Sequence, residues 1–246
     1  MIKLCTIDLD GTLFDNQKNI SEENKLAIKR AKDNGCKIVI ATGRPYNGVV
    51  PVLKELDLIS TSDYVICYNG AKVFNTKTME LIFSNTISGR VVKEIYKESK
   101  RLNTYFHAFR KNEELITDVH NPYTDVEVRI NKIIDHIVDF NTLNDNDEFL
   151  KCMMVGKDTI VDEAIKHLNP KYNEEYSVVR SAPIFLEFLN KSTNKGTALE
   201  ALATYLHIEI GETMAIGDAG NDLAMIEKAG IGVAMENSFP EVKKVA

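Results

Sequence analysis

Two carboxylates separated by one residue follow the first apolar run of the chain. The run covers residues 2–7, and Asp8 and Asp10 come directly after it in the sequence DLDGT. Because side chains alternate along a strand, Asp8 and Asp10 are expected to point the same way. Two adjacent carboxylates repel each other, so they need a cation or a shared proton. Magnesium suits such oxygen ligands and can bridge to a phosphate. The simpler reading is an Asp-rich turn.

A second candidate motif, ATGRP, covers residues 41–45 after the next apolar run. The hydroxyl of Thr42, the flexible Gly43 and the first amides of a following helix would make a phosphate cradle. An ordinary strand-to-helix turn is the alternative. Arg44 on this loop, and Asn69 after the third apolar run, are candidates for contacts with the substrate.

Two further motifs come late in the chain. Lys195 and Gly196 stand at the start of a predicted helix, where a lysine opposes the helix dipole. This favours a role for Lys195 as a cation for an anionic substrate, although lysines usually lie on solvated faces. The second motif, GDAGND at 217–222, places Asp218, Asn221 and Asp222 after another β-prone run.

The elements around these motifs alternate between strand and helix. Residues 2–7, 37–43 and 64–70 read as strands, with helices from Ser21 to Gly35 and after Pro45. From Lys195 the same rhythm returns. This order predicts right-handed crossovers and a parallel sheet. Ligands bind at the carboxyl ends of the strands in such sheets, so the four motifs are expected to meet at one site.

The middle of the chain has a different pattern. Residues 71–85 read as a hairpin around 76–79, residues 88–101 and 159–168 as helices, and 104–109, 114–119, 151–156, 176–181 and 184–190 as strands. Residues 120–148 are polar and show no clear pattern. We therefore predict an α/β fold, a Rossmann-like doubly wound parallel sheet made of 1–82 and 188–246, with an α+β cap domain, 83–187, inserted.

Composition narrows the class of protein. Thirty basic and 36 acidic residues give a formal charge of −6, which argues against a nucleic-acid binder but not against a small phosphorylated ligand. The sequence has neither a signal-peptide core nor an apolar stretch long enough for a membrane span. Its four cysteines form no CxxC pair, so we expect a reduced cytoplasmic protein with buried thiols.

Taken in order, DLDGT, ATGRP, NKG and GDAGND resemble the four motifs of the haloacid dehalogenase (HAD) phosphohydrolases. The GDxxND variant and the long insertion after the third strand resemble the Cof-type subfamily. Such proteins usually continue beyond the segment IGVAMENSFPEVKKVA with a short strand and a closing helix, so the sequence, which ends at Ala246, is expected to be truncated or to lack those elements.

The resemblance implies a role for each motif residue. Asp8 would attack phosphorus and form an aspartyl-phosphate, and Asp10 would act as general acid and base. Residues implied to hold the phosphate are Thr42, Lys195, Asn221 and the amides of Leu9 and Gly43. Residues implied to bind Mg²⁺ are Asp8, Asp218 and the carbonyl group of Asp10, with Asp222 orienting them. Charge counting over Asp8, Asp10, Asp218, Lys195 and Mg²⁺ predicts a raised pKa for Asp10 once phosphate is bound.

The predicted function is a magnesium-dependent phosphatase of small phosphorylated metabolites, such as sugar phosphates. The inserted domain would exclude water and select the leaving group. Two alternatives stay open at this stage. The chain could be a phosphotransferase or phosphomutase acting on a sugar phosphate, or a non-catalytic sensor of a phosphorylated ligand. The sequence does not address the oligomeric state.

Overall fold

The computed structural model describes residues 1–246. The chain forms two compact units, a core unit of Met1–Ser84 and Asn194–Ala246, and an inserted unit of Asn85–Thr193. An insertion of 83–187 would have ended inside strand β12 (Phe185–Asn190), which pairs along its length with β11 (Tyr176–Ala182). Because a strand belongs with the partner that satisfies its backbone hydrogen bonds, the inserted unit extends beyond residue 187.

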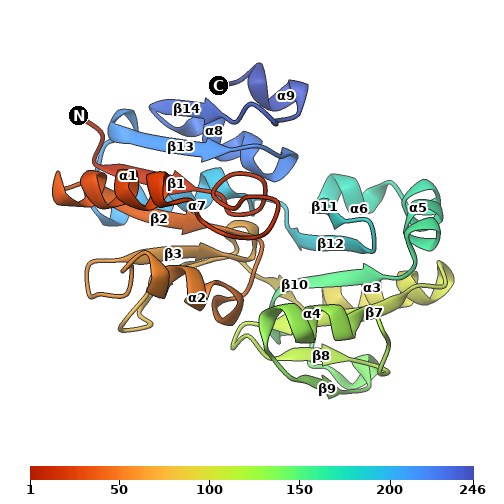
Figure 1. Cartoon of the computed structure of the whole chain (residues 1–246). Coiled ribbons are helices and arrows are strands. Elements are labelled where there is room, and N and C mark those ends of the chain that lie inside the picture. The colour runs from red at the N-terminus through yellow and green to blue at the C-terminus, as the bar shows by residue number, and fades with distance from the viewer. The chain divides into compact units, whose positions relative to one another are not determined.

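The core unit contains a seven-stranded sheet in the order β14-β13-β1-β2-β3-β4-β5 (Figure 1). The five strands from β14 to β3 are parallel, and β4 and β5 form the predicted antiparallel hairpin at the edge. This arrangement confirms the α/β class. The strands are β1 (Leu4–Ile7), β2 (Lys37–Ala41), β3 (Tyr64–Cys67), β4 (Lys72–Asn75), β5 (Leu81–Ser84), β13 (Thr213–Gly217) and β14 (Ile231–Ala234).

Helices cover both faces of the core sheet (Figure 1). The first helix begins where the sequence predicts, because the Ser21 side chain accepts a hydrogen bond from the Asn24 amide at 3.2 Å. On the opposite face, apolar residues of α7 and α8 pack against strand residues such as Val39. The helices and 3₁₀ turns are α1 (Glu22–Asp33), α2 (Tyr46–Glu55), α7 (Lys195–Tyr205), α8 (Leu223–Lys228), α9 (Pro240–Lys243), η1 (Tyr68–Gly70), η3 (Ile210–Glu212) and η4 (Gly220–Asp222).

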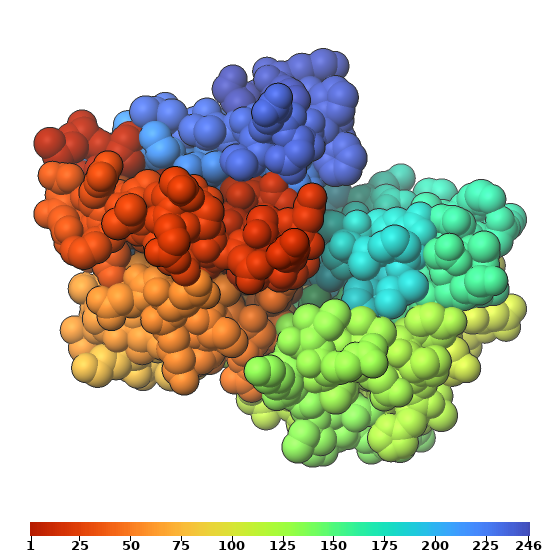
Figure 2. Space-filling view, viewed as in Figure 1, coloured from red at the N-terminus to blue at the C-terminus, as the bar shows by residue number.

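The first strand occupies the point where the strand order reverses. It pairs with β2 on one side and with β13, which comes much later in the chain, on the other. Ile7 is level with Ile40 of β2 and with Ile216 of β13, so the loops after these strands begin side by side. Figure 2 shows the N-terminal and C-terminal segments adjoining on the surface of this unit. Open α/β sheets bind ligands at such a switch point.

The inserted unit has its own mainly antiparallel sheet in the order β11-β12-β10-β7-β8-β9, with β6 paired to β10. Besides β11 and β12, its strands are β6 (Ile87–Ser88), β7 (Tyr105–Arg110), β8 (Leu115–Thr117), β9 (Asp135–Ile137) and β10 (Glu148–Val155). Its helices and 3₁₀ turn are α3 (Gly89–Arg101), α4 (Thr124–Asn131), α5 (Asp158–His167), α6 (Lys171–Glu175) and η2 (Phe140–Thr142). The unpatterned stretch 120–148 therefore contains α4, β9 and η2.

Alternation along the strands gives the inserted sheet two different faces. One face carries an apolar cluster in which Phe106, Cys152 and Met154 pack with residues of α3, α5 and α6. His107 of β7 and Lys151 of β10 alternate with these residues along their strands and are also buried. Lys151 forms a 3.0 Å ion pair with Glu187 of β12, and His107 contacts Thr124 of α4.

The sequence also predicts reduced, buried thiols, and it contains no apolar stretch long enough for a membrane span. All four cysteines are free; three are buried and Cys36 is half-buried. None of the helices is both long enough and apolar enough to cross a bilayer.

Candidate active site

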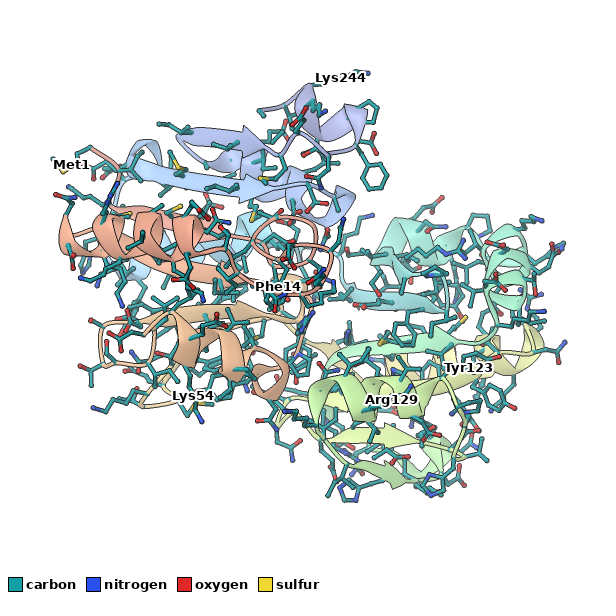
Figure 3. The ribbon with its side chains drawn as sticks, viewed as in Figure 1. Met1, Phe14, Lys54, Tyr123, Arg129 and Lys244 are labelled. Carbon is teal, nitrogen blue, oxygen red and sulfur yellow. The ribbon has the colours of Figure 1, made fainter.

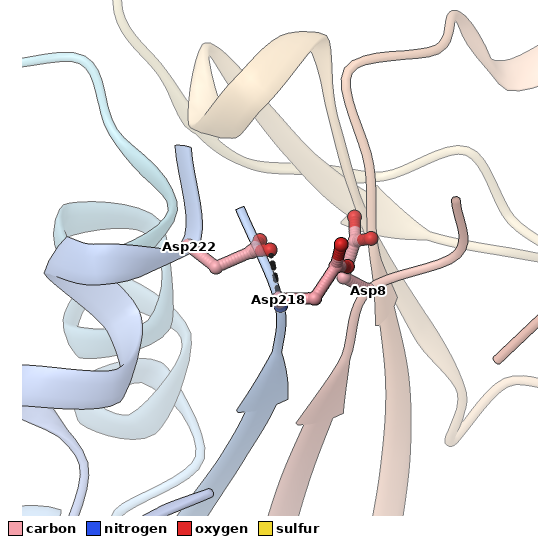
Figure 4. Close-up of side chains that lie close together, drawn as sticks. All are labelled: Asp8, Asp218 and Asp222. Atoms are coloured by element: carbon pink, nitrogen blue, oxygen red, sulfur yellow. Dashed lines mark hydrogen bonds between the residues drawn. The ribbon is translucent and has the colours of Figure 1, made fainter. Parts of the chain in front are cut away.

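Asp8 and Asp218 lie at the carboxyl ends of the adjacent strands β1 and β13 (Figure 4). Both residues are buried, with 5% and 9% of their surface exposed. With Asp222 they form a group in which one carboxylate oxygen of each residue lies within 4.8 Å of the others. Three carboxylates this close need compensating positive charge.

Lys195 supplies part of that charge. Its Nζ lies 2.5 Å from Oδ1 of Asp8 and 2.7 Å from Oδ1 of Asp222, and its side chain is fully buried. Asn194 caps α7 by accepting a hydrogen bond from the Thr197 amide at 2.8 Å, which fixes Lys195 in the first turn. Burial disfavours the ammonium charge, but Asp8 and Asp222 outweigh it and raise the pKa of Lys195. The helix-start lysine is thus a buried cation rather than a solvated one.

Asp8 is a buried carboxyl group beside a cation. Burial raises its pKa to about 6, while the charge of Lys195 and hydrogen bonds from Lys195 and the Leu9 backbone act in the opposite direction. At neutral pH the side chain is therefore a carboxylate, the form that can attack phosphorus.

Asp222 is fully engaged in hydrogen bonds. Its Oδ2 accepts from the amides of Asp218 and Ala219, each at 3.0 Å, and its Oδ1 accepts from Lys195. The first of these bonds is the dashed line in Figure 4. These contacts hold the loop after β13 and the lysine in place, which suits an orienting residue better than a metal ligand.

Asp218 is oriented by residues to which the sequence analysis assigned no role. The Thr12 hydroxyl donates to its Oδ1 at 2.7 Å, and Asn237 Nδ2 lies 3.5 Å from its Oδ2. Asn237 also donates to the carbonyl oxygen of Gly11 at 2.9 Å. Burial raises the pKa of Asp218. The oxygen donors of Asp8 and Asp218, on neighbouring strands and short of positive charge, fit a hard divalent cation.

Asp10 lies in a different environment from Asp8. Strand β1 ends at Ile7, so the strand alternation used to predict a shared direction does not reach Asp10. Its carboxylate accepts hydrogen bonds from Arg44 at 2.8–3.1 Å and from Lys18 at 2.5 Å. Burial opposes ionisation, but these two cations outweigh it and hold the pKa of Asp10 below its usual value. The raised pKa predicted for Asp10 applies to the phosphate-bound form. The charge count behind that prediction left out Lys18 and Arg44.

The loop after β2 and the turn after β3 contact each other and, through Asn221, the loop after β13. Asn69 donates its amide to the carbonyl oxygen of Thr42 at 3.0 Å, and its side-chain oxygen accepts from Asn221 at 3.1 Å. A Cβ on Gly43 would come within 3.1 Å of the Asn69 side chain, so the loops are closely packed. Asn69 is in the left-handed region with φ 54°, a conformation that asparagine tolerates better than most residues. Thr42, Gly43, Asn69 and Asn221, from three separate motifs, are thereby brought together.

A large apolar groove of the core unit adjoins this site at Thr12 but contains none of its charged groups. It has a volume of about 670 Å³ and lies between α1 and the strands β1, β2, β13 and β14. Residues such as Ile28, Ile38 and Val233 line it, and none of the catalytic candidates Asp8, Asp10, Lys195 and Asp218 does. The presence of a large groove therefore does not locate the chemistry.

Comparisons with known proteins agree with this geometry. The sequence profile of the haloacid dehalogenase-like hydrolases matches residues 5–246. The protein named "Putative phosphatase YxeH" from Bacillus subtilis (strain 168) is 38% identical over 252 residues, covering 100% of this chain and 92% of the relative.

Solved structures also resemble this chain over nearly all of its length. A haloacid dehalogenase-like hydrolase from Bacteroides thetaiotaomicron has a TM-score of 0.85 at 31% identity, covering 100% of this chain and 92% of the other. The HAD subclass IIB sugar phosphatase BT4131 has a TM-score of 0.80 at 25% identity, covering 99% and 91%. The match of profile, sequence and structure over nearly the whole chain means that this chain belongs to the haloacid dehalogenase-like hydrolases and is a phosphatase acting on small phosphorylated substrates.

Proposed function

We propose that the protein is a magnesium-dependent phosphatase that hydrolyses sugar phosphates or related metabolites through an aspartyl-phosphate on Asp8. The observation that carries this proposal is the buried contact of 2.5 Å between Lys195 and Asp8, beside Asp218 at the switch point of the sheet. The contact keeps the proposed carboxylate nucleophile next to a fixed cation, which reduces the repulsion that a dianionic phosphate meets as it approaches.

The reaction has two displacement steps. First, an oxygen of Asp8 attacks phosphorus, the phosphoester bond breaks, and Asp10 gives a proton to the departing alcohol oxygen. Then Asp10 takes a proton from water, the water oxygen attacks phosphorus, and the acyl-phosphate bond breaks to release phosphate and restore Asp8. Asp10 lies outside the buried group and its side chain is 43% exposed, so water can reach it for the second step. The first step needs its protonated form, and we expect bound phosphate to raise the pKa of Asp10, which Arg44 and Lys18 lower in this structure.

The transferred phosphate would be held by groups on three loops and on the first turn of α7. Lys195 and the side chains of Thr42 and Asn221 would contact its oxygens, together with the backbone amides of Leu9 and Gly43. Asp8, Asp218 and the carbonyl oxygen of Asp10 would hold Mg²⁺. When bound, the ion supplies positive charge that lowers the repulsion between Asp8 and the phosphate. Asp222 would keep Lys195 and the loop after β13 in position.

The class of substrate rests on similarity. BT4131 is named as a sugar phosphatase and resembles this chain over almost its whole length. A sugar phosphate is therefore the first substrate to test, within a broad panel of phosphoesters.

Phosphate release from that panel tests the proposal. We expect turnover with Mg²⁺ and loss of turnover with a chelator. Asp8→Asn removes the nucleophile and should reduce kcat by about 10³-fold or more. Asp33→Asn, an exposed residue of α1, is the matched control and should turn over normally. Full turnover by Asp8→Asn would refute the mechanism. Transfer of the phosphoryl group to an acceptor sugar, without release of phosphate when the sugar is absent, would indicate a phosphotransferase or phosphomutase, and binding without release would indicate a sensor.

A further inference from the structure

Two cations meet one carboxylate at the edge of the proposed active site. Arg44 donates to Asp10 through Nη2 at 2.8 Å and 3.0 Å and through Nε at 3.1 Å. Lys18 approaches the same carboxylate at 2.5 Å. We name Lys18 and Arg44 the rim cation pair. Together with the carboxylate of Asp10 they carry a net charge of +1.

The loop between β1 and α1 holds Lys18 in place. Lys18 is in the left-handed region with φ 64°, which is unusual for a residue other than glycine. Its amide donates to the carbonyl oxygen of Asp15 at 3.0 Å. The side chain of Asp15 in turn accepts from the amides of Gln17 and Asn19, both at 2.8 Å. This tight turn presents the lysine to Asp10.

Arg44 is held by its own neighbours. Its amide donates to the Thr42 hydroxyl at 3.2 Å, and its carbonyl oxygen accepts from the Tyr68 amide at 3.2 Å. Its guanidinium carbon lies 5.4 Å from the ring centre of Phe14, a cation–π distance. Figure 3 labels Phe14 near the carboxyl end of β1. The guanidinium is therefore oriented before any ligand arrives.

The rim cation pair differs from the other cation of the site in exposure. Lys195 is fully buried and contacts two carboxylates, so its charge is already balanced. The side chains of Lys18 and Arg44 are 59% and 22% exposed and share a single carboxylate. The surplus positive charge thus faces solvent, beside the residue proposed to protonate the leaving group.

We propose that Lys18 and Arg44 bind a second acidic group of the substrate, a carboxylate or a second phosphate, located a few bonds from the ester oxygen. The inference rests on the proposed function, in which Asp10 contacts the leaving group. Arginine can bind a carboxylate or phosphate through two parallel hydrogen bonds, and lysine adds a point charge.

A matched pair of substrates tests the inference. 3-Phosphoglycerate and glycerol 3-phosphate share a three-carbon chain and differ in a carboxylate against a hydroxymethyl group. The wild type should have the higher kcat/KM for 3-phosphoglycerate. Arg44→Gln and Lys18→Gln should each lower the ratio of the two kcat/KM values about tenfold, the effect of losing one charge-assisted hydrogen bond. Lys29→Gln, an exposed cation on α1, should leave the ratio unchanged.

A second pair separates the two kinds of acidic group. 1,3-Propanediol bisphosphate and its monophosphate differ only in the second phosphate, and preference within this pair alone would identify phosphate as the ligand. Arg44→Lys keeps the positive charge and should retain part of the preference. If Arg44→Gln folds poorly, Arg44→Lys still tests whether the charge at this position matters.

Three results would count against the inference. An equal loss on both members of a pair would assign the cations to the transferred phosphate. A wild type that hydrolyses other esters without preferring the acidic member of either pair would also overturn it. A wild type that hydrolyses no ester at all would instead refute the proposed function.

Discussion

Asp8 and Lys195 are 187 positions apart in the sequence, yet their Oδ1 and Nζ atoms lie 2.5 Å from each other inside the core unit. The contact joins the first strand to the helix that opens the second part of this unit. Because both groups are buried, neither can be compensated by water if the other is removed. The same interaction therefore affects both the stability of the core unit and its chemistry.

Replacing Lys195 should destabilise the protein strongly. Lys195→Met leaves the carboxylates of Asp8 and Asp222 buried without their cation, and breaking a buried pair costs about 3–5 kcal/mol of unfolding free energy. Urea unfolding measures the loss. Asp222→Asn in the same chain should recover part of it, because one uncompensated charge disappears. Lys228→Met, which breaks a partly exposed pair with Glu200, should cost less than about 1 kcal/mol.

The double variant decides between charge and packing. If Lys195→Met is destabilised only because a methylene chain is lost or rearranged, adding Asp222→Asn should lower stability further instead of restoring it.

Two glycines with similar backbone angles should respond differently to alanine. A Cβ on Gly11 would lie 2.4 Å from Oδ2 of Asp218, whereas a Cβ on Gly35 meets nothing within 4 Å. Their φ angles are +93° and +83°, so both substitutions carry backbone strain of about 1 kcal/mol. We expect Gly35→Ala to lose only that much stability and to keep its activity. Gly11→Ala should also lose at least tenfold in kcat/KM, because Asp218 has to move. Similar activity in the two variants would show that Asp218 does not need its present position.

The hydroxyl of Thr12 should influence metal affinity. It donates to Asp218 at 2.7 Å, and removing the partner of a metal ligand typically weakens metal binding 10–100-fold. Thr12→Val should therefore need about ten times more Mg²⁺ for half-maximal phosphate release. Thr6→Val is the matched control, because Thr6 is also buried but donates to the carbonyl oxygen of Met214. Equal Mg²⁺ requirements in the two variants would mean that Asp218 is not a ligand or that Thr12 does not orient it.

The fold of the core unit could be predicted from local sequence. Its apolar runs are short and continuous, and a capping residue such as Ser21 fixes where a helix begins. The parallel order then brings the ends of β1, β2 and β13 to one edge. Periodicity was less informative in 120–148, where α4 has its Thr124, Glu127 and Asn131 buried through polar contacts instead of an apolar stripe.

The parts of the site that could not be predicted from the sequence have one physical feature in common. Lys18, Thr12 and Asn237 reach their partners through loops, and the type of residue in a loop does not reveal which distant atom it will contact. Lys18 in particular belongs to a polar turn that looks solvated in the sequence. Asp10 was assigned a direction by strand alternation, which stops at the end of β1. Motif residues at strand ends were easier to predict because backbone pairing determines their positions.

His107 predicts a specific loss of stability in acid. It is fully buried in the inserted unit, with Nδ1 3.0 Å from the Thr124 hydroxyl and Nε2 3.1 Å from Sδ of Met153. Burial, and then the charge of Lys151, lower its pKa to about 3 from the usual 6.5. Between these values the unfolded chain binds a proton that the folded chain does not. The stabilising contribution is therefore complete above about pH 6.5 and decreases as the pH falls toward 3, by about 1.4 kcal/mol per pH unit.

Hydrogen exchange of the β7 and β10 amides across this pH range measures that decrease in the intact chain, after correction for the intrinsic pH dependence of exchange. His107→Gln removes the titrating group while keeping polar atoms near Thr124, so its stability should vary less with pH than that of the wild type. His167→Gln, whose side chain on α5 is 68% exposed, should retain the wild-type slope. If His107→Gln and the wild type lose stability in parallel, other groups of the inserted unit must bind the proton, and burial of His107 is not the cause of its acid sensitivity.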